Sequence, residues 1–237
     1  MGKTNNSSSG AINRSHFIKS GIIFSAVAIG GLNLLSSCND KDEDKEVSPP
    51  EDLMQEHGLL NRILLIYDAC RMHLINKEPF AIDGLGEAAG IIKAFVEDYH
   101  EKQEENYLFP RFEKVGKLTD LVQVLRTQHD KGRNITAQLI ELTKTSNRNE
   151  SDDQKLITLL GTFNIMYRPH EAREDTMLFP AFRKIVSRHE YDSLGEEFEK
   201  NEQKHFGEGG FEKMVDKVAA IEKRLGIYDL SQFTPTG

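Results

Sequence analysis

The sequence predicts an all-α protein: an antiparallel four-helix bundle with an internal two-fold repeat and one or two extra helices at its carboxyl end. Three observations support this fold class. Long segments carry apolar residues at helical spacing, alternating strand patterns are weak, and one histidine-bearing pattern occurs twice. A repeated helix pair builds a bundle because neither pair can bury its apolar face without the other.

The repeat combines a fifteen-residue block with a histidine far upstream of it. The blocks HEKQEENYLFPRFEK and HEAREDTMLFPAFRK begin at His100 and His170, seventy positions apart, and eight of their fifteen positions are identical. His57 precedes the first block by 43 residues, and His129 precedes the second by 41. Each half is therefore predicted to be helix, loop, helix, with one histidine on its first helix and the block on its second.

The four histidines lie on apolar helical faces. Around His57, the residues Leu53, Leu60 and Leu64 stand at −4, +3 and +7. Apolar residues flank the other three histidines at similar spacing, among them Val122, Leu125, Phe95, Val96, Tyr99, Phe163, Met166 and Tyr167. A hydrogen bond explains one buried histidine, but four on matched faces favour a metal, because buried polar groups need partners.

Each block also offers a carboxylate one helical turn after its histidine. His100 is followed by Glu104, and His170 by Glu174, so each pair projects from one face of its helix. Leu-Phe-Pro then follows in both blocks, which a chance pairing does not explain. Mixed imidazole and carboxylate ligands suit iron, manganese or zinc, and the absence of thiolates from the set argues against an iron–sulfur cluster.

These motifs resemble the hemerythrin-like (HHE cation-binding) family, four-helix bundles that hold a non-haem di-iron centre, over roughly residues 50–187. The resemblance implies two iron ions with an oxo or hydroxo bridge, and two bridging glutamates. Asp175 is an alternative to Glu174, because oxygen-carrying members place a carboxylate five residues after the last histidine. The implied ligands are His57, His100, Glu104, His129, His170 and Glu174.

One departure from the oxygen carriers bears on function. Their third helix carries His-x-x-x-His, whereas Arg133 follows His129 here. The pattern is instead similar to the branch associated with nitric-oxide stress and repair of iron centres. We expect an open or water-filled position at the metals. Gly132 either leaves space beside them or only eases the packing of its helix. Acceptors for the outer imidazole nitrogens are expected among Glu56, Glu101, Glu171, Tyr67 and Tyr167.

The expected function is to bind or react with a small ligand, O2, NO or H2O2, in oxygen binding or in defence against nitrosative or oxidative stress, with an electron donor that the sequence does not identify. Whether the chain is an enzyme stays open. One alternative is a ferritin-like di-iron bundle, using Glu97 with His100 and Glu202 with His205. Another is a structural or interaction module that a metal only braces.

Residues 1–37 resemble a secretory signal peptide. Basic residues precede an apolar run over about 21–35, and the Leu-Ser-Ser before Cys38 completes a pattern similar to a bacterial lipobox. This resemblance implies a lipid on Cys38 and an exported protein anchored to a bacterial membrane, either periplasmic or at the cell surface. Arg14-Ser15 resembles a twin-arginine motif with its second arginine replaced, so the export route stays open.

The remaining domain boundaries follow from composition. Residues 38–52 are acidic with two prolines and are predicted to be a flexible linker, 53–187 the bundle, and 188–237 a helical appendage and tail. Without residues 1–37 the formal charge falls from −8 to −11, which argues against nucleic acid as a partner. Cys70 is expected to be a small buried hydrophobe.

Overall fold

The structure is a computed structural model that describes residues 47–145 and 147–235. The predicted signal peptide, the lipid site at Cys38 and the start of the acidic linker lie outside these residues. Every regular element within the two described ranges is helical, which confirms the predicted all-α fold. None of the helices in these ranges has the length and apolarity needed to cross a membrane.

The first bundle helix, α2, spans Pro49–Asn76. It begins inside the segment predicted to be linker, so residues 49–52 are helical rather than flexible. The start is fixed by Ser48, whose backbone N–H donates to Glu51 Oε2 at 3.1 Å, and by prolines that suit a first helical turn. The first bundle helix therefore begins four residues before the predicted start of the bundle.

Each predicted second helix is a succession of α and π turns. In the first half these are α3 (Ile82–Ile91), η2 (Ile92–His100), α4 (Glu101–Gln103), η3 (Glu104–Leu108) and α5 (Phe109–Val115). In the second half, α7 (Glu150–Arg173) continues through η4 (Glu174–Leu178) into α8 (Phe179–Phe182). The π-helical turns η3 and η4 occupy equivalent positions, just before the Phe-Pro of each block. Proline has no N–H for the helical ladder, and a wider turn ahead of it accommodates that loss.

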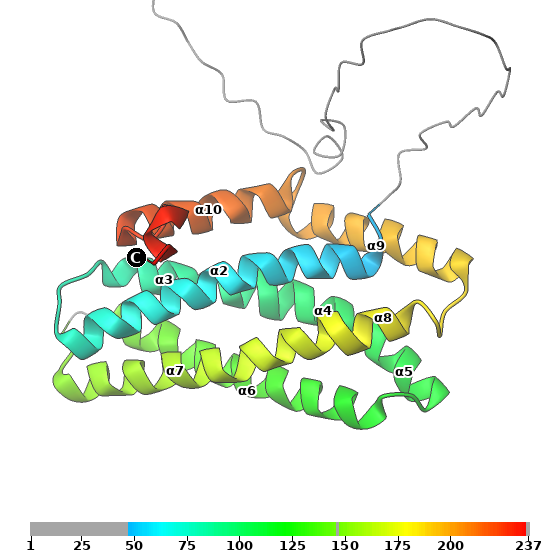
Figure 1. Cartoon of the computed structure of the whole chain (residues 1–237), viewed down its shortest axis with the longest axis horizontal. Helices are drawn as coiled ribbons and strands as arrows, with labels where there is room; N and C mark the ends of the chain where they lie inside the picture. Colours follow the sequence, from blue (N-terminus) through cyan, green and yellow to red (C-terminus); the bar gives the residue numbers. More distant parts are fainter. Residues whose placement is uncertain (1–46, 146, 236–237) are drawn as a thin grey trace, which may run out of the picture.

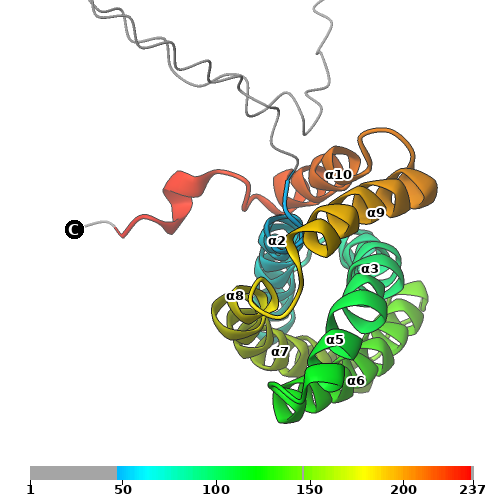
Figure 2. The same cartoon turned by 90° about the vertical axis from the view of Figure 1, so that its right-hand side faces the viewer.

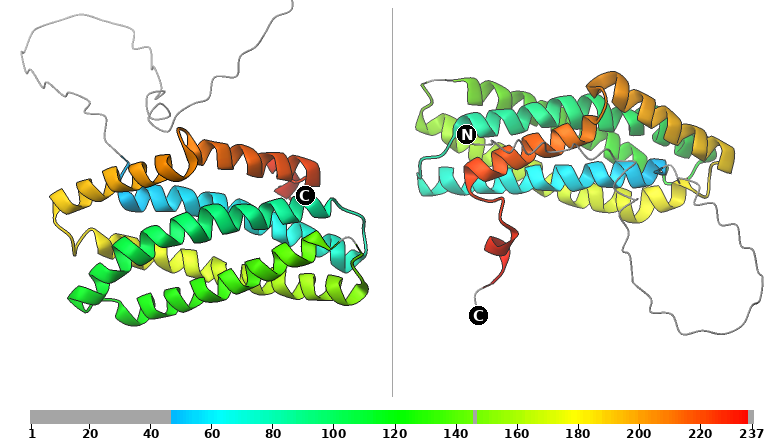
Figure 3. Two further views of the ribbon diagram at one scale, coloured as in Figure 1. Left: turned by 180° about the vertical axis from the view of Figure 1, so that it is seen from behind. Right: turned by 90° about the horizontal axis from the view of Figure 1, so that it is seen from above.

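The third bundle helix, α6, spans Thr119–Lys144, and α7 follows it after a short loop. Seen along the bundle, four helical segments surround one axis in the order α2, α7, α6 and the α3–α5 succession (Figure 2). The appendage consists of α9 (Arg188–Phe206) and α10 (Gly210–Leu225), which lie across α2 and α3 (Figures 1 and 2). After α10 the chain turns away from the bundle and carries only η5 (Leu230–Phe233), as the view from above shows (Figure 3).

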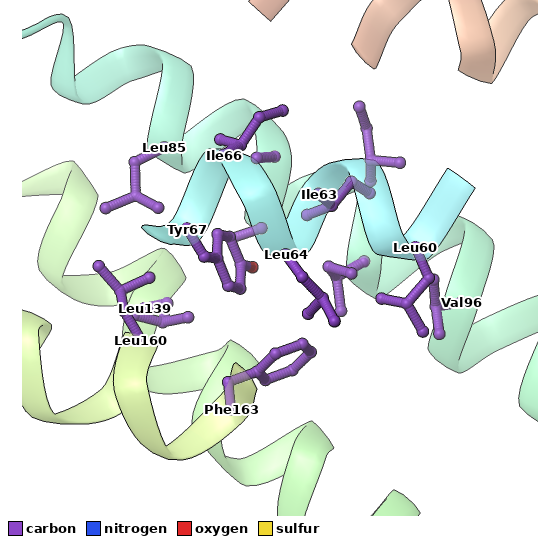
Figure 4. Packing of buried hydrophobic residues seen from close by; sticks show 14 of the residues in the cluster. Leu60, Ile63, Leu64, Ile66, Tyr67, Leu85, Val96, Leu139, Leu160 and Phe163 are labelled. Carbon is purple, nitrogen blue, oxygen red and sulfur yellow. The ribbon is translucent and has the colours of Figure 1, made fainter. Parts of the chain in front are cut away.

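The apolar core is divided into two clusters. The larger one joins α2 to α3, α6, α7 and α10, and Figure 4 shows Tyr67 of α2 facing Leu139, Leu160 and Phe163. It also contains Cys70, a free thiol whose pKa burial raises to about 12, as fits an unreactive core residue. The smaller cluster gathers Leu108, Phe109, Phe112, Leu178, Phe179 and Phe182, the apolar residues of the two repeated blocks.

The start of α7 depends on a side-chain cap. Asn149 Oδ1 accepts from Ser151 N at 2.8 Å and Asp152 N at 3.2 Å, and Asp152 Oδ2 accepts from Asn149 N. We expect Asn149→Ala to lower the free energy of unfolding by about 1 kcal/mol, because two helix-end donors lose their acceptor. Chemical denaturation checks this, with Asn149→Ser as the control that keeps a capping oxygen. Equal losses in both variants would contradict the assignment.

Candidate metal centre

The structure brings the six predicted ligands together in the middle of the bundle, between the two apolar clusters. His57 comes from α2 and His129 from α6, while the other four come from the repeated blocks. None of the six side chains is more than 4 % exposed. Their nitrogen and oxygen atoms form two groups capable of holding a metal, one with His57, His100 and Glu104 and the other with Glu104, His129, His170 and Glu174.

The two glutamates lie between histidines of different halves. Glu104 Oε2 is 3.8 Å from His100 Nε2 of its own half and 3.4 Å from His129 Nε2 of the other. Glu174 mirrors this, with Oε1 3.2 Å from His170 Nε2 and Oε2 3.4 Å from His57 Nε2. A carboxylate in this position can offer one oxygen to each of two metal ions. The halves therefore meet as two histidine pairs joined by two carboxylates.

Each histidine turns its other ring nitrogen, Nδ1, to an acceptor outside the centre, and the four acceptors follow the internal repeat. The residue before each first-helix histidine is the acceptor for the second histidine of the same half. The residue after each of the two glutamates is the acceptor for the first-helix histidine of the other half. The pairs are His100 with Glu56 Oε2 at 2.7 Å, His170 with Gln128 Oε1 at 2.8 Å, His129 with Glu105 Oε1 at 3.0 Å and His57 with Asp175 Oδ1 at 2.8 Å.

These contacts give Glu174 and Asp175 different positions relative to His57. Both carboxylates touch His57, but Glu174 faces its inner nitrogen and is fully buried, whereas Asp175 holds the outer nitrogen and is 36 % exposed on its side chain. Glu105 occupies the position equivalent to Asp175. Of the acceptors expected from the sequence, only Glu56 bonds to a histidine. Glu105, Asp175 and Gln128 were not predicted as acceptors, although both blocks carry a carboxylate at the position of Glu105 and Asp175.

The arrangement of His129 and His170 fits a cation. Their Nδ1 atoms face oxygen acceptors, which favours the tautomer with the proton on Nδ1 and a lone pair on Nε2. The two Nε2 atoms are only 3.2 Å apart. Two lone pairs at that distance repel each other, and a metal ion that accepts both removes the conflict. Carboxylates as partners of the outer nitrogens also raise the basicity of imidazole ligands.

The two buried glutamates also indicate a site for a cation. Within the described ranges, neither oxygen of Glu104 or of Glu174 has a hydrogen-bond donor in suitable geometry, although both side chains are wholly buried. Buried carboxylate oxygens without donors cost several kcal/mol unless a cation or a proton satisfies them. The residues present therefore fit a two-metal centre of imidazole and carboxylate ligands, the donor set that suits iron.

Burial and neighbouring charges raise the pKa values of some predicted ligands and lower those of others. Burial alone lowers the pKa of His57, but its contacts with Asp175 and Glu174 prevail and raise it to about 10. Burial and the neighbouring His57 lower the pKa of His100 to about 3. Burial and the charge of Glu174 raise the pKa of Glu104 well above its ordinary value. Metal ions and protons therefore compete directly for this cluster.

Gly132 does not leave open space beside the metals, contrary to the expectation from the sequence. A Cβ atom at this position would lie 2.0 Å from the hydroxyl oxygen of Tyr167, so the ring of that tyrosine fills the space. The Tyr167 hydroxyl donates to Glu101 Oε1 at 2.8 Å. The missing side chain of Gly132 therefore allows a buried tyrosine to reach the wall of the centre.

Arg133, which stands where oxygen carriers have a histidine, points to the outer carboxylates. Its Nη2 is 2.7 Å from Glu101 Oε2 and 2.5 Å from Glu105 Oε1. Burial raises the pKa of Glu105, but hydrogen bonds from His129, Lys102 and Arg133 outweigh it and keep that pKa well below its ordinary value. Arg133 thus holds Glu105 ionised as the partner of His129.

The ferritin-like alternative finds no geometric support. None of the metal-capable groups within the described ranges includes Glu97 or His205. His205 is exposed, and its ring bonds to the backbone oxygen of Asn201. Glu202 joins a different set of carboxylates with Asp52 and Glu56.

The space around the histidines is small. A narrow gap beside His57 and His100 is lined by Glu56, Leu60, Phe95 and Val96 and has no room even for a water molecule. Two aromatic rings from the repeated Leu-Phe-Pro cover the opposite side. Phe179 stacks on His57 at 5.5 Å between ring centres, and Phe109 on His129 at 5.6 Å.

Comparison with known proteins agrees with this geometry. The sequence profile described as the Hemerythrin HHE cation binding domain matches residues 48–182 and, in a second overlapping match, residues 120–219. Uncharacterized proteins of Mycobacterium tuberculosis (strain H37Rv) and Mycobacterium bovis are 46 % identical to the chain over 196 residues, covering 82 % of this chain and 77 % of theirs. No solved structure gives a significant match.

Proposed function

Because the chain belongs to the hemerythrin HHE cation-binding family, we propose that it holds two iron ions and uses them to react with a small oxidant, O2, NO or peroxide. His57 and His100 would hold one ion, and His129 and His170 the other. Glu104 and Glu174 would serve as carboxylate ligands between the two histidine pairs. The observation that supports this assignment best is the inward convergence of four Nε2 atoms on two carboxylates, whose oxygens find no hydrogen-bond donor in the described part of the chain.

The chain's own residues prepare the site for this chemistry. Four acceptors keep each imidazole as the tautomer that can bind metal through Nε2. The apolar clusters on both sides keep bulk water and larger molecules away. When bound, a ferrous pair supplies two electrons and coordination positions that protein ligands do not fill.

The direction of Arg133 favours reaction over reversible oxygen carriage. A histidine at this position would be available as a further ligand, but the guanidinium is turned to Glu101 and Glu105 and cannot bind a cation. With these six residues as the protein ligands, both ions would keep a coordination position for a small ligand. Open positions favour redox turnover with peroxide or NO, and we propose this as the function, in defence against oxidative or nitrosative stress.

The location follows from the amino-terminal pattern rather than from the bundle. We propose that the chain is exported and that a lipid on Cys38 tethers it to a bacterial membrane. The acidic stretch that follows would then separate the bundle from the membrane surface. The electron donor is accordingly a partner outside the cytoplasm.

The test is to load the full chain with ferrous iron without oxygen and to add H2O2, NO or O2 in turn. We expect peroxide or NO to be consumed repeatedly when a chemical reductant is supplied, and His170→Ala to abolish this consumption. His189→Ala, an exposed histidine, is the matched control. A stable oxygenated spectrum that reverses when O2 is removed would favour carriage instead. No spectral response to any of the three would favour the structural role.

A further inference from the structure

The chain beyond α10 forms an arm that leaves the bundle. Gly226 caps the end of α10 in the left-handed conformation, with a φ of 71°, and the N–H of Ile227 donates to the backbone oxygen of Glu222 at 2.9 Å. Ile227 still packs on the larger apolar cluster, but every residue from 228 to 235 is exposed. We refer to residues 228–235 as the arm. In the view along the bundle and in the view from above, the arm points away from the helices (Figures 2 and 3).

The arm presents large apolar side chains to solvent. Its turn η5 begins after Asp229, whose Oδ1 accepts from Ser231 N at 2.9 Å. The turn carries Leu230, which is 81 % exposed, and Phe233, which is also exposed. A helical turn of four residues has too few hydrogen bonds to be stable by itself. Apolar side chains of this size also favour a place out of water. The arm is therefore suited to pack on an apolar surface that lies elsewhere.

The side of the bundle from which the arm leaves has an exposed apolar surface. On α2, Leu65 and Met72 stand two helical turns apart, so both point outward, and both are exposed. On α7, Ile165 is 76 % exposed. The two helices lie side by side, and Asn164 Nδ2 of α7 donates to Leu64 O of α2 at 2.9 Å. We refer to Leu65, Met72 and Ile165 as the apolar face. Figure 2 shows that the arm leaves on the side of α2 and α7.

The apolar face presents little charge to an approaching molecule. Asp68 and Arg168, which lie between α2 and α7, form an ion pair with each other. The exposed residues that follow one another at helical spacing along α7 are uncharged, namely Thr158, Thr162, Ile165, Pro169 and Ala172. The whole chain has a formal charge of −8, so two copies repel each other over much of their surface. The apolar face therefore allows a second copy of this acidic chain to approach with little repulsion.

We propose that two copies of the chain form a dimer in which the arm of each lies on the apolar face of the other. The arm and the apolar face are on one side of the bundle, so a two-fold axis brings both pairs of contacts together at once. Leu230 and Phe233 supply the apolar side chains of the arm. Exposed apolar patches of this kind mark surfaces for association. The dimer goes beyond the proposed two-iron function, because none of these residues belongs to the metal centre.

Cross-linking between two co-expressed, differently tagged copies of the full chain, held in a mild detergent, tests the exchange of arms. One copy carries Leu230→Cys and the other carries Met72→Cys, and a short bismaleimide joins thiols that lie close together. We expect a cross-linked pair that contains both tags. In the matched control, Gln138→Cys on α6, exposed and across the bundle from α2, replaces Met72→Cys and should give no such pair above background (Figure 2). Cys70 is buried, and both mixtures contain the same Cys38.

The mass of the particle gives a second readout, measured by sedimentation in a solvent whose density matches the detergent. We expect twice the mass of one 26.9 kDa chain. The double variant Leu230→Ser/Phe233→Ser should raise the dissociation constant of the dimer at least about tenfold. Val124→Ser, which removes an apolar side chain exposed on α6, is the matched control and should match the wild type. All of these positions are exposed, so the bundle should fold in each variant.

Either readout can overturn the dimer. A wild-type chain that stays monomeric at micromolar concentration would do so, as would a double arm variant that dimerises as tightly as the wild type. Cross-links that form only when Leu230→Cys and Met72→Cys are in one chain would place the arm on its own bundle and overturn the exchange.

Discussion

Glu174→Gln should lose both iron ions, to less than about a tenth of the wild-type content, while Asp175→Asn should retain them. Glu174 lies between His170 and His57, so removing its charge deprives both ions of a bridging ligand. Asp175 meets only the outer nitrogen of His57. Its replacement should weaken metal affinity by about 10- to 100-fold, the usual effect of removing an outer partner.

Metal analysis and the ferric absorption spectrum, recorded on both variants after loading with iron, measure this difference. The two substitutions remove the same charge at adjacent positions, so each serves as the control for the other. Retention of iron by Glu174→Gln together with its loss from Asp175→Asn would reverse the assignment and make Asp175 the ligand.

Gly132→Ala should destabilise the bundle by about 3 kcal/mol, at the upper end for overpacking a core. The new methyl group would lie 2.0 Å from the Tyr167 hydroxyl oxygen and less than 3 Å from two of its ring carbons. Tyr167 is 1 % exposed and packed against Phe163 at 4.3 Å between ring centres, so it has little room to move. Its hydrogen bond to Glu101 would also be lost.

The control for this substitution is Gly90→Ala. Gly90 is an exposed helical residue, and a Cβ there meets nothing within 4 Å. Alanine at such a site should raise the free energy of unfolding by about 0.5–1 kcal/mol. Denaturant unfolding of both variants provides the comparison. A Gly132→Ala protein as stable as Gly90→Ala would mean that Tyr167 does not occupy the space beside Gly132.

The internal repeat made much of this centre predictable from the sequence. A block that recurs with a histidine and a glutamate one turn apart must place both pairs at equivalent positions of a two-fold bundle. The upstream histidines followed from the same spacing. The same symmetry favoured Glu174 over Asp175 but did not exclude Asp175, because the choice depends on which carboxylate faces the inner nitrogen of His57 across the bundle.

Features that depend on packing between distant segments escaped prediction. Gly132 suggested open space, but only the position of Tyr167 on α7 shows that the space is filled. The outer partners cross from one half to the other, as Glu105 does to His129, and sequence spacing carries no information on that exchange.

A crystal of the iron-loaded chain, measured at wavelengths on both sides of the iron absorption edge, tests the central claim most directly. Two iron peaks about 3.5 Å apart are expected between the Nε2 atoms of the four histidines, with Glu104 and Glu174 contacting both. A single peak, or iron bound elsewhere while the four histidines stay metal-free, would contradict the two-iron centre.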